Sequence, residues 1–185
     1  MKPLILASAS PQRQILLKEA GIRFIVDPAH IEEDLTLNMP PLELARFWSF
    51  KKAEEVAKRH PTKLILGADT IVAIDGQCLG KPRTKKEGLA MLRLLNGKTH
   101  RVITGFTLLD SGEKHALTHA VTTFVQFKKN RIKTLREYVQ TGEPMGKAGA
   151  YAIQGKGAAL IARIEGSYSN VLGLPMEEVQ RAIRG

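Results

Sequence analysis

The sequence predicts a single α/β domain over residues 1–185, built on a mixed and strongly twisted β-sheet flanked by helices. Three observations lead to this prediction. Short apolar runs alternate with helical segments through the first half of the chain. The second half contains longer runs with β-branched residues, which are typical of strands. No repeat, low-complexity tract or linker divides the 185 residues, so they fit one domain.

Turn and capping residues delimit the elements expected in the first half. Ser10 can cap the first helix, Pro11 suits its first position and Gly21 ends it. The pair Asp75-Gly76 suits the tight turn of a hairpin. In order, we expect a strand at 4–7, a helix at 11–20, a strand at 24–28, a proline-bounded helix at 41–59, a strand at 63–69 that runs into a loop, a hairpin at 70–80 and a helix at 84–97.

The second half is expected to be richer in strands. Its elements are strands at 100–110 and 114–128, a short helix at 135–142, a strand at 158–166 and a closing helix at 174–184. Apolar runs are too short to span a bilayer, and Cys78 is the only cysteine, which excludes an intramolecular disulfide. We therefore expect a cytoplasmic protein with no membrane partner.

The chain is basic, with 28 Lys and Arg against 18 Asp and Glu and a formal charge of +10. A basic surface attracts nucleic acids, nucleotides and acidic membranes, but a solvated basic surface is the ordinary alternative. The cations are dispersed, and aromatic residues make up only 5% of the chain, which leaves little for stacking on bases. Neither zinc-type Cys/His spacing nor a nucleophile elbow is present.

Arg13 is expected in the first turn of a helix, where the helix dipole disfavours a cation by about 0.3–1 kcal/mol. Ser8 and Ser10 flank the same turn with hydroxyl groups. A strand, a turn of small residues and a helix N-terminus together form a common phosphate-binding geometry. A bound anion between Arg13 and the helix end would make the arginine tolerable. The alternative is a capped helix with an exposed arginine.

Lys52 falls near the centre of the apolar face of the helix at 41–59, whereas Lys51 points away. A lysine on an apolar face either extends past the helix edge to water or finds a partner, such as a phosphate or a carboxylate.

Acidic residues follow two of the expected strands. Asp69 comes directly after an apolar run, where ligand-binding groups of open α/β sheets gather. Glu33 lies in the acidic segment "HIEED", which could equally be a solvated turn. Mg²⁺ beside a phosphate needs only one or two carboxylates, and Lys81 in "LGKPR" adds a cation in a rigid turn.

Five ordered segments resemble the Maf family of nucleoside triphosphate pyrophosphatases, and the resemblance runs nearly end to end. They are "LILASASPQRQILLKEAG", "LGADTIVAIDGQCLGKP", "NGKTHRVITG", "EPMGKAGAYAIQGKGA" and "IEGSYSNVLGLP". The resemblance implies a two-lobed Maf/inosine-triphosphatase-like fold with a cleft along a long twisted sheet, often as a homodimer. It also implies a cytoplasmic hydrolase dependent on Mg²⁺ or Mn²⁺, which releases a nucleoside monophosphate and pyrophosphate.

The resemblance also implies roles for particular residues. Asp69 matches the family's general base, Glu33 an acid of metal binding and catalysis, and Lys81 a phosphate-contacting lysine counted here as catalytic. Glu33 and Asp69 would hold the metal. The substrate-binding residues would be Ser8, Ser10, Arg13, Lys52, Gln12, Thr70 and Gln154.

Thr70 and Gln154 match the group of the family that acts on dTTP and UTP. An amide donates and accepts at once, as the uracil edge requires, although Gln154 could instead be a turn residue. Gln12 departs from the arginine usual in that group, which leaves base preference open. The alternatives are a pyrophosphatase for 7-methyl-GTP or other modified nucleotides, a non-catalytic nucleic-acid-binding protein, and a regulator of cell division. We expect no specific nucleic-acid partner.

Overall fold

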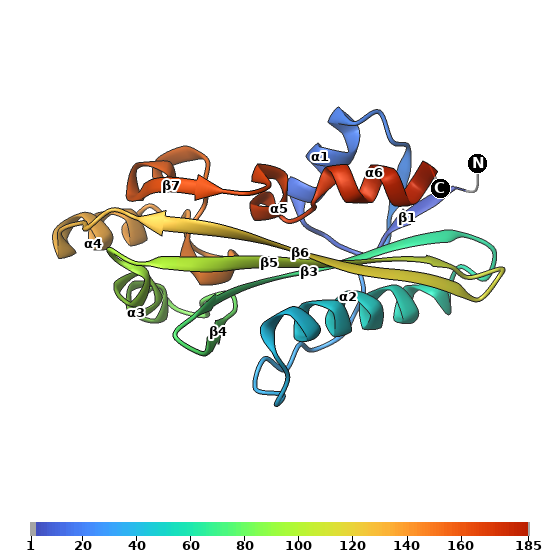
Figure 1. Ribbon diagram of the computed structural model, residues 1–185, viewed down its shortest axis with the longest axis horizontal. Helices are drawn as coiled ribbons and strands as arrows, with labels where there is room; N and C mark the ends of the chain where they lie inside the picture. Colours follow the sequence, from blue (N-terminus) through green and yellow to red (C-terminus); the bar gives the residue numbers. More distant parts are fainter. Residues whose placement is uncertain (1–2, 185) are drawn as a thin grey trace.

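The computed structural model describes residues 3–184, which form a seven-stranded sheet with helices on both faces (Figure 1). The strands are β1 (Leu4–Leu6), β2 (Phe24–Val26), β3 (Leu64–Ile74), β4 (Gln77–Leu79), β5 (Thr99–Asp110), β6 (His115–Phe127) and β7 (Ile161–Glu165). The helices are α1 (Pro11–Glu19), α2 (Pro41–Ala57), α3 (Lys85–Leu95), α4 (Ile132–Gln140), α5 (Tyr168–Leu172) and α6 (Met176–Arg184). Two short 3-10 helices, η1 (Ala148–Ala150) and η2 (Gly155–Leu160), precede β7. The α/β class predicted from the sequence is confirmed.

The sheet is mixed, and β3 joins its two parts. The strand order is β2-β1-β3-β5-β6-β7, and β4 pairs with β3 as a hairpin. β1 pairs in parallel with both β2 and β3, whereas β3, β5, β6 and β7 pair in antiparallel fashion. The long strands β3, β5 and β6 run along the molecule, with α2 on one face and α1 and α6 on the other (Figure 1).

Asp69 lies within a strand, and the expected loop after residue 69 is wrong. β3 is one strand of eleven residues from Leu64 to Ile74. Its parallel partner β1 ends at the Leu6–Leu66 pair, but β5 continues to pair with it as far as Ala73. Asp69 is therefore three residues beyond the last parallel pair and is held by antiparallel pairing with β5.

Two other differences fall in the last third of the chain. The strand expected at 158–166 begins only at Ile161, because the preceding residues form η2 after Gly155, whose φ is +66°. The short helix α5, which was not expected from the sequence, follows β7. Its N-terminal cap is Ser167, whose hydroxyl accepts a hydrogen bond from the Asn170 N–H.

Two glycines allow α2 to lie directly against the sheet. A Cβ at Gly67 would lie 2.2 Å from the carbonyl oxygen of Ser49, and one at Gly105 would lie 2.2 Å from that of Ala45. Gly105 is the β5 residue paired with Asp69. The absence of side chains at these two positions therefore brings α2, which carries Lys52, close to the strand that carries Asp69.

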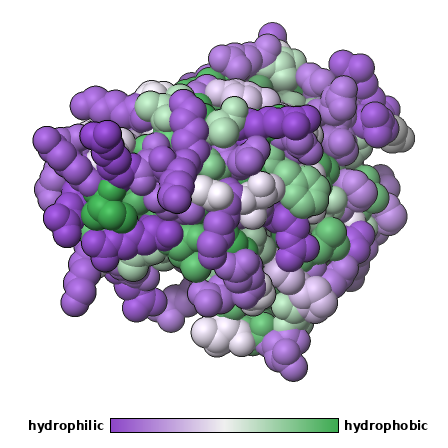
Figure 2. Space-filling model, turned by 60° about the vertical axis from the view of Figure 1, so that its left-hand side comes forward, coloured by the Kyte–Doolittle hydropathy of each residue, from purple (hydrophilic) through white to green (hydrophobic). Residues whose placement is uncertain are grey.

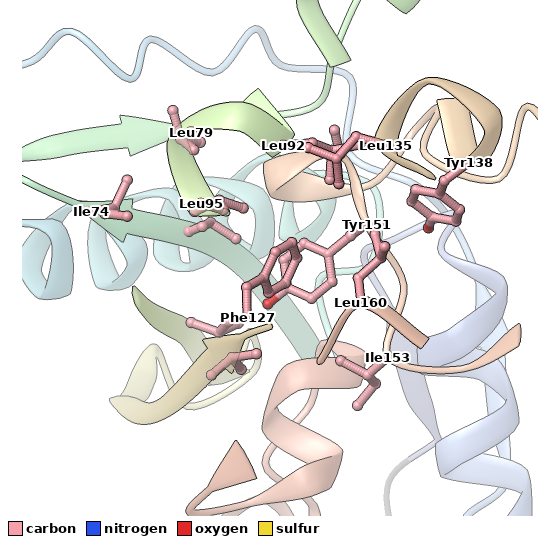
Figure 3. Close-up of a cluster of buried hydrophobic side chains, with 14 of the residues drawn as sticks. Ile74, Leu79, Leu92, Leu95, Phe127, Leu135, Tyr138, Tyr151, Ile153 and Leu160 are labelled. Carbon is pink, nitrogen blue, oxygen red and sulfur yellow. The ribbon is translucent and has the colours of Figure 1, made fainter. Parts of the chain in front are cut away.

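The apolar core forms several clusters against the sheet, and two of them lie between α2 and the strands. A different cluster lies between the sheet, α1 and α6, and includes Leu17, Phe106 and Val179. Another lies at the end that carries α3 and α4, where Tyr151 and Phe127 lie next to each other and Tyr138 lies at the margin (Figure 3).

Hydrophilic side chains dominate the face shown in Figure 2, where apolar side chains emerge only in small areas. Within residues 3–184, none of the helices has both the length and the apolar character needed to cross a bilayer.

Candidate active site

A cavity of about 570 Å³ opens beside β1, β3 and the segment that follows α4. Its volume is within the range of about 300–1,000 Å³ typical of small-molecule sites. The structure brings all of the site residues predicted from the sequence to the walls of this one cavity. They are Ser8, Ser10, Gln12, Arg13, Glu33, Lys52, Asp69, Thr70, Lys81 and Gln154.

Lys52 links the two acidic residues of the cavity. Its Nζ lies 2.6 Å from Oδ1 of Asp69 and 2.6 Å from Oε1 of Glu33. It also donates to the carbonyl oxygen of Ala68 at 3.4 Å. The side chain is buried, so it does not extend past the helix edge to water. Of the two expectations for Lys52, the structure confirms a buried lysine with carboxylate partners. These partners are Asp69 and Glu33, which come from two different segments.

The environments of the two acids shift their pKa values in opposite directions. Burial raises the pKa of Asp69; the positive charge of Lys52 opposes this, and the negative charge of Glu33 adds to it. Burial also disfavours ionised Glu33, but the charge and hydrogen bond of Lys52, together with the charge of Lys81, outweigh burial and lower its pKa. Glu33 is therefore the ionised acid, and Asp69 is the acid that binds a proton more readily.

Arg13 is buried beneath the N-terminus of α1 and bonded to protein oxygens. Its Nε donates to Gly173 O at 2.9 Å, and its Nη1 donates to Ser8 Oγ and Ala68 O, both at 2.9 Å. Its Nη2 donates to Thr70 Oγ1 at 3.0 Å. Four of the five guanidinium N–H groups thus have protein acceptors, which leaves one for a ligand.

The charge of Arg13 is also balanced within the protein. Burial lowers the pKa of its guanidinium, while the negative charges of Asp69 and Glu33 partly offset this effect. The sequence suggested that a bound anion makes this cation tolerable at a helix N-terminus. Internal hydrogen bonds and the two nearby carboxylates stabilise the Arg13 guanidinium without a bound anion, and the side chain is buried. The alternative of an exposed arginine is therefore wrong.

The remaining predicted residues fall into three groups: the serines at the start of α1, Thr70 beside Arg13, and three solvent-accessible residues of the cavity wall. Ser8 Oγ accepts from the Ser10 N–H at 3.3 Å, and Ser10 caps α1 by accepting from the Arg13 N–H. Thr70 Oγ1 shares a hydrogen bond with Thr104 Oγ1 at 3.0 Å. Gln12, Lys81 and Gln154 lie on the cavity wall with solvent-accessible side chains, Lys81 and Gln154 being exposed.

Two further polar side chains of the cavity wall, Lys147 and Tyr151, were not predicted from the sequence. Both belong to the same segment as Gln154, "EPMGKAGAYAIQGKGA". Tyr151 is buried, and its hydroxyl lies 2.7 Å from Nε2 of His100. A tyrosine between small residues in a chain with few aromatic residues was the available signal.

The two acids form a suitable, though minimal, donor set for a divalent cation. Oδ2 of Asp69 is buried and has no hydrogen-bond partner within residues 3–184, so it is available to a ligand. The described residues contain no group of three or more metal-binding side chains. Mg²⁺ commonly takes one or two carboxylates and completes its shell with water and substrate phosphate oxygens. The residues present fit such an ion, provided that the substrate supplies further oxygens.

The fold and the site together define a class of protein. The protein is an α/β enzyme, and its cavity contains two acids in different states: Asp69, whose pKa is raised, and Glu33, which is ionised. Lysine side chains and the N-terminus of helix α1 lie on the same cavity wall. The sequence model of the family described as "Maf-like protein" matches residues 3–185, so the chain belongs to the Maf family.

Curated relatives match the chain over nearly its whole length. It is 43% identical to the dTTP/UTP pyrophosphatase of Bacillus pumilus (strain SAFR-032), over 99% of this chain and 96% of that protein. It is 46% identical to the dTTP/UTP pyrophosphatase of Geobacter sp. (strain M21), over 98% and 94%. Among solved structures, a HAM1 protein from Coxiella burnetii has 19% identity and a TM-score of 0.48, over 70% of this chain and 75% of that one.

Proposed function

We propose that this protein hydrolyses dTTP and UTP to the nucleoside monophosphate and pyrophosphate. The observation that carries the proposal is the Lys52 bridge between Asp69 and Glu33 on the cavity wall. The curated relatives that match the chain over nearly its full length are named dTTP/UTP pyrophosphatases, which supports this choice of substrates.

Asp69 acts as the general base in this proposal. It takes one proton from a water molecule whose oxygen attacks the α-phosphorus. The bond between the α-phosphorus and the α–β bridging oxygen breaks, so that pyrophosphate leaves with that oxygen and the monophosphate keeps the oxygen of the water. Asp69 then releases its proton to solvent. A general base must be ionised and within hydrogen-bond reach of the water, and Asp69 lies on the wall of the cavity. Lys52 holds one carboxylate oxygen of Asp69, so the side chain keeps a fixed orientation.

The phosphate chain lies along the N-terminus of α1 in this proposal. The backbone N–H of Gln12, the hydroxyls of Ser8 and Ser10, and the remaining N–H of Arg13 would bind phosphate oxygens. Lys81 would meet the departing pyrophosphate from the exposed rim. Gln154 would bind the uracil or thymine edge, with Gln12 beside it, and Thr70 would act by holding Arg13.

A divalent cation, Mg²⁺ or Mn²⁺, would be held by Glu33 and by Oδ2 of Asp69. When bound, such an ion neutralises charge on the triphosphate and orients it. Glu33 fits this role because its lowered pKa keeps it ionised.

The test is a nucleotide panel assayed for pyrophosphate with Mg²⁺ or Mn²⁺, and again with a chelator. We expect dTTP and UTP to be the best substrates, chelation to stop turnover, and Asp69→Asn to lose at least about 100-fold in kcat, the lower end of general-base effects. A preference for 7-methyl-GTP would replace the substrate assignment. A fully active Asp69→Asn protein would rule out the role of that residue. Tight, salt-dependent binding to nucleic acid without pyrophosphate release would overturn the enzyme function.

A further inference from the structure

Backbone N–H groups of the turn that carries Gln154 donate hydrogen bonds to one carboxylate, that of Glu143. Oε1 of Glu143 accepts a hydrogen bond from the Gly157 N–H at 2.8 Å, and Oε2 accepts one from the Lys156 N–H at 3.0 Å. These backbone groups lie two and three residues after Gln154. Glu143 therefore fixes the chain on one side of that glutamine.

Tyr138 fixes the chain on the other side. Its hydroxyl donates to Oε1 of Glu143 at 3.0 Å and accepts from the Ala152 N–H at 3.1 Å. The tyrosine stands on α4, and its ring is buried at the margin of the apolar cluster in Figure 3. The hydroxyl thus ties the residue two positions before Gln154 to a packed helix.

The turn packs closely against both of these side chains. A Cβ at Gly157 would lie 2.2 Å from Ala152 O and 2.6 Å from the Tyr138 hydroxyl. Gly155 has φ +66°, and a Cβ there would lie 2.8 Å from Oε2 of Glu143. The turn therefore closes against Tyr138 and Glu143 with no space for larger residues. Neither of these two side chains is among the described residues that line the cavity.

We propose that Glu143 and Tyr138 are positioning residues, which hold Gln154 at the cavity and so determine recognition of the nucleotide base. They act on base binding and leave the phosphate chemistry of Lys52 and Asp69 unchanged. This inference rests on the proposed function, because it assumes that Gln154 meets the base of a nucleoside triphosphate.

The experiment compares Glu143→Ala and Tyr138→Phe with a control, Glu137→Ala, on the exposed side of α4. For each protein, kcat and KM are measured with UTP and dTTP, and equilibrium binding is measured with a non-hydrolysable UTP analogue and with pyrophosphate. We expect Glu143→Ala to raise KM and the analogue Kd about tenfold, and Tyr138→Phe about threefold, with kcat changed less than about twofold. Pyrophosphate binding stays at the wild-type value, and the control changes nothing.

A double variant separates positioning from a general loss of structure. Combined with Gln154→Ala, the Glu143→Ala change should add nothing further to KM, because both act through the same contact. Tyr138→Phe retains the buried ring, so it tests the inference even if Glu143→Ala fails to fold.

Three results would overturn the inference while the proposed function stands: unchanged KM and analogue binding in both variants, a loss confined to kcat, or full additivity with Gln154→Ala. Wild-type protein that neither binds the analogue nor releases pyrophosphate from UTP would overturn both.

Discussion

The two parts of the proposed binding mode are built in different ways: the phosphate end, formed by Lys52, Asp69 and Arg13, and the base end, formed by Gln154. At the phosphate end, the charged groups stand on or next to regular elements: Lys52 on α2, Asp69 within β3 and Arg13 in the first turn of α1. All three are buried and bonded to one another or to nearby backbone. At the base end, Gln154 is exposed on a turn that backbone hydrogen bonds to a single glutamate hold in place.

This difference indicates which substitutions the protein tolerates in each part of the site. Groups that perform the chemistry must keep their geometry within a fraction of an ångström, and helices and strands supply that rigidity. A recognition group on a turn can change its contacts without disturbing the core. Substitutions at the phosphate end should therefore affect stability and activity together, whereas those at the base end should affect binding alone.

The largest effect is expected for Lys52→Met, which leaves the buried carboxylate of Asp69 and the partly exposed carboxylate of Glu33 without their cation. Breaking a buried ion pair by removing one partner costs about 3–5 kcal/mol, so we expect a loss of that size in the free energy of unfolding. Activity should fall to background, and the pKa of Glu33 should rise. Denaturant unfolding and the pyrophosphate assay measure both. Lys51→Met is the control, because Lys51 is more exposed and its ion pair within residues 3–184 is with the partly exposed Glu54. Equal losses in the two variants would contradict the comparison.

Acid should destabilise the cluster of His100, Phe127 and Tyr151, in which the His100 ring packs edge to face against both aromatic rings. Tyr151 stands three residues before Gln154. Burial lowers the pKa of His100 to about 4 from an ordinary value of 6.5. Between these values the unfolded chain binds the proton and the folded chain does not, so stability falls as the pH falls from 6.5 to 4. At about 1.4 kcal/mol per pKa unit, the loss attributable to His100 is about 3 kcal/mol. We expect the unfolding free energy of His100→Leu to fall less over this range. Parallel curves for both proteins would disprove the assignment.

Gly105→Ala tests the close approach of α2 to the sheet. The new methyl group would meet the Ala45 carbonyl at 2.2 Å, so the helix must shift, and overpacking of this kind costs about 1–3 kcal/mol. Because the helix carries Lys52, kcat should fall with stability. Gly88→Ala in α3 is the matched control: its Cβ would lie 3.6 Å from Pro82, an ordinary contact, and alanine favours helix by about 0.5–1 kcal/mol. Thermal unfolding and steady-state kinetics of the two variants provide the measurement, and a neutral Gly105→Ala would show that the approach is not tight.

The smallest effect is expected for Gln154→Ala at the base end. Loss of one hydrogen-bonding side chain is worth about 0.5–1.5 kcal/mol, so KM for UTP should rise up to about tenfold. The melting temperature and kcat should not change, since the side chain is exposed and remote from Asp69 in the proposed mode of binding. A drop in kcat of the same size as the rise in KM would remove the distinction between the two ends.

Local signals in the sequence predicted the order of the elements and pointed to the unusual residues. Arg13 and Lys52 attracted notice because each violates a local rule, the first of helix dipoles and the second of apolar helix faces. Local sequence patterns could not show the contacts that stabilise these residues. Arg13 bonds to Gly173, 160 positions away, and Lys52 bonds to Asp69, 17 positions away.

Tertiary contacts also explain what the sequence could not predict. Asp69 was expected at the end of a strand, but β5 extends that strand by pairing, a contact made some 35 residues later. No sequence pattern distinguishes Glu143 from a surface glutamate. Its carboxylate accepts three hydrogen bonds, from the Tyr138 hydroxyl and from two backbone N–H groups, and backbone groups carry no sequence signature.

The bond between Arg13 and Gly173 also bears on how the protein is made. Ribosomes add about 5–20 residues per second, so the carbonyl that holds this guanidinium is synthesised on the order of ten seconds after the arginine itself. The nascent chain therefore lacks one acceptor of the buried Arg13 guanidinium until residue 173 has been added and has folded back. This wall of the cavity is thus completed late in synthesis, well after the helix that carries the arginine has been made.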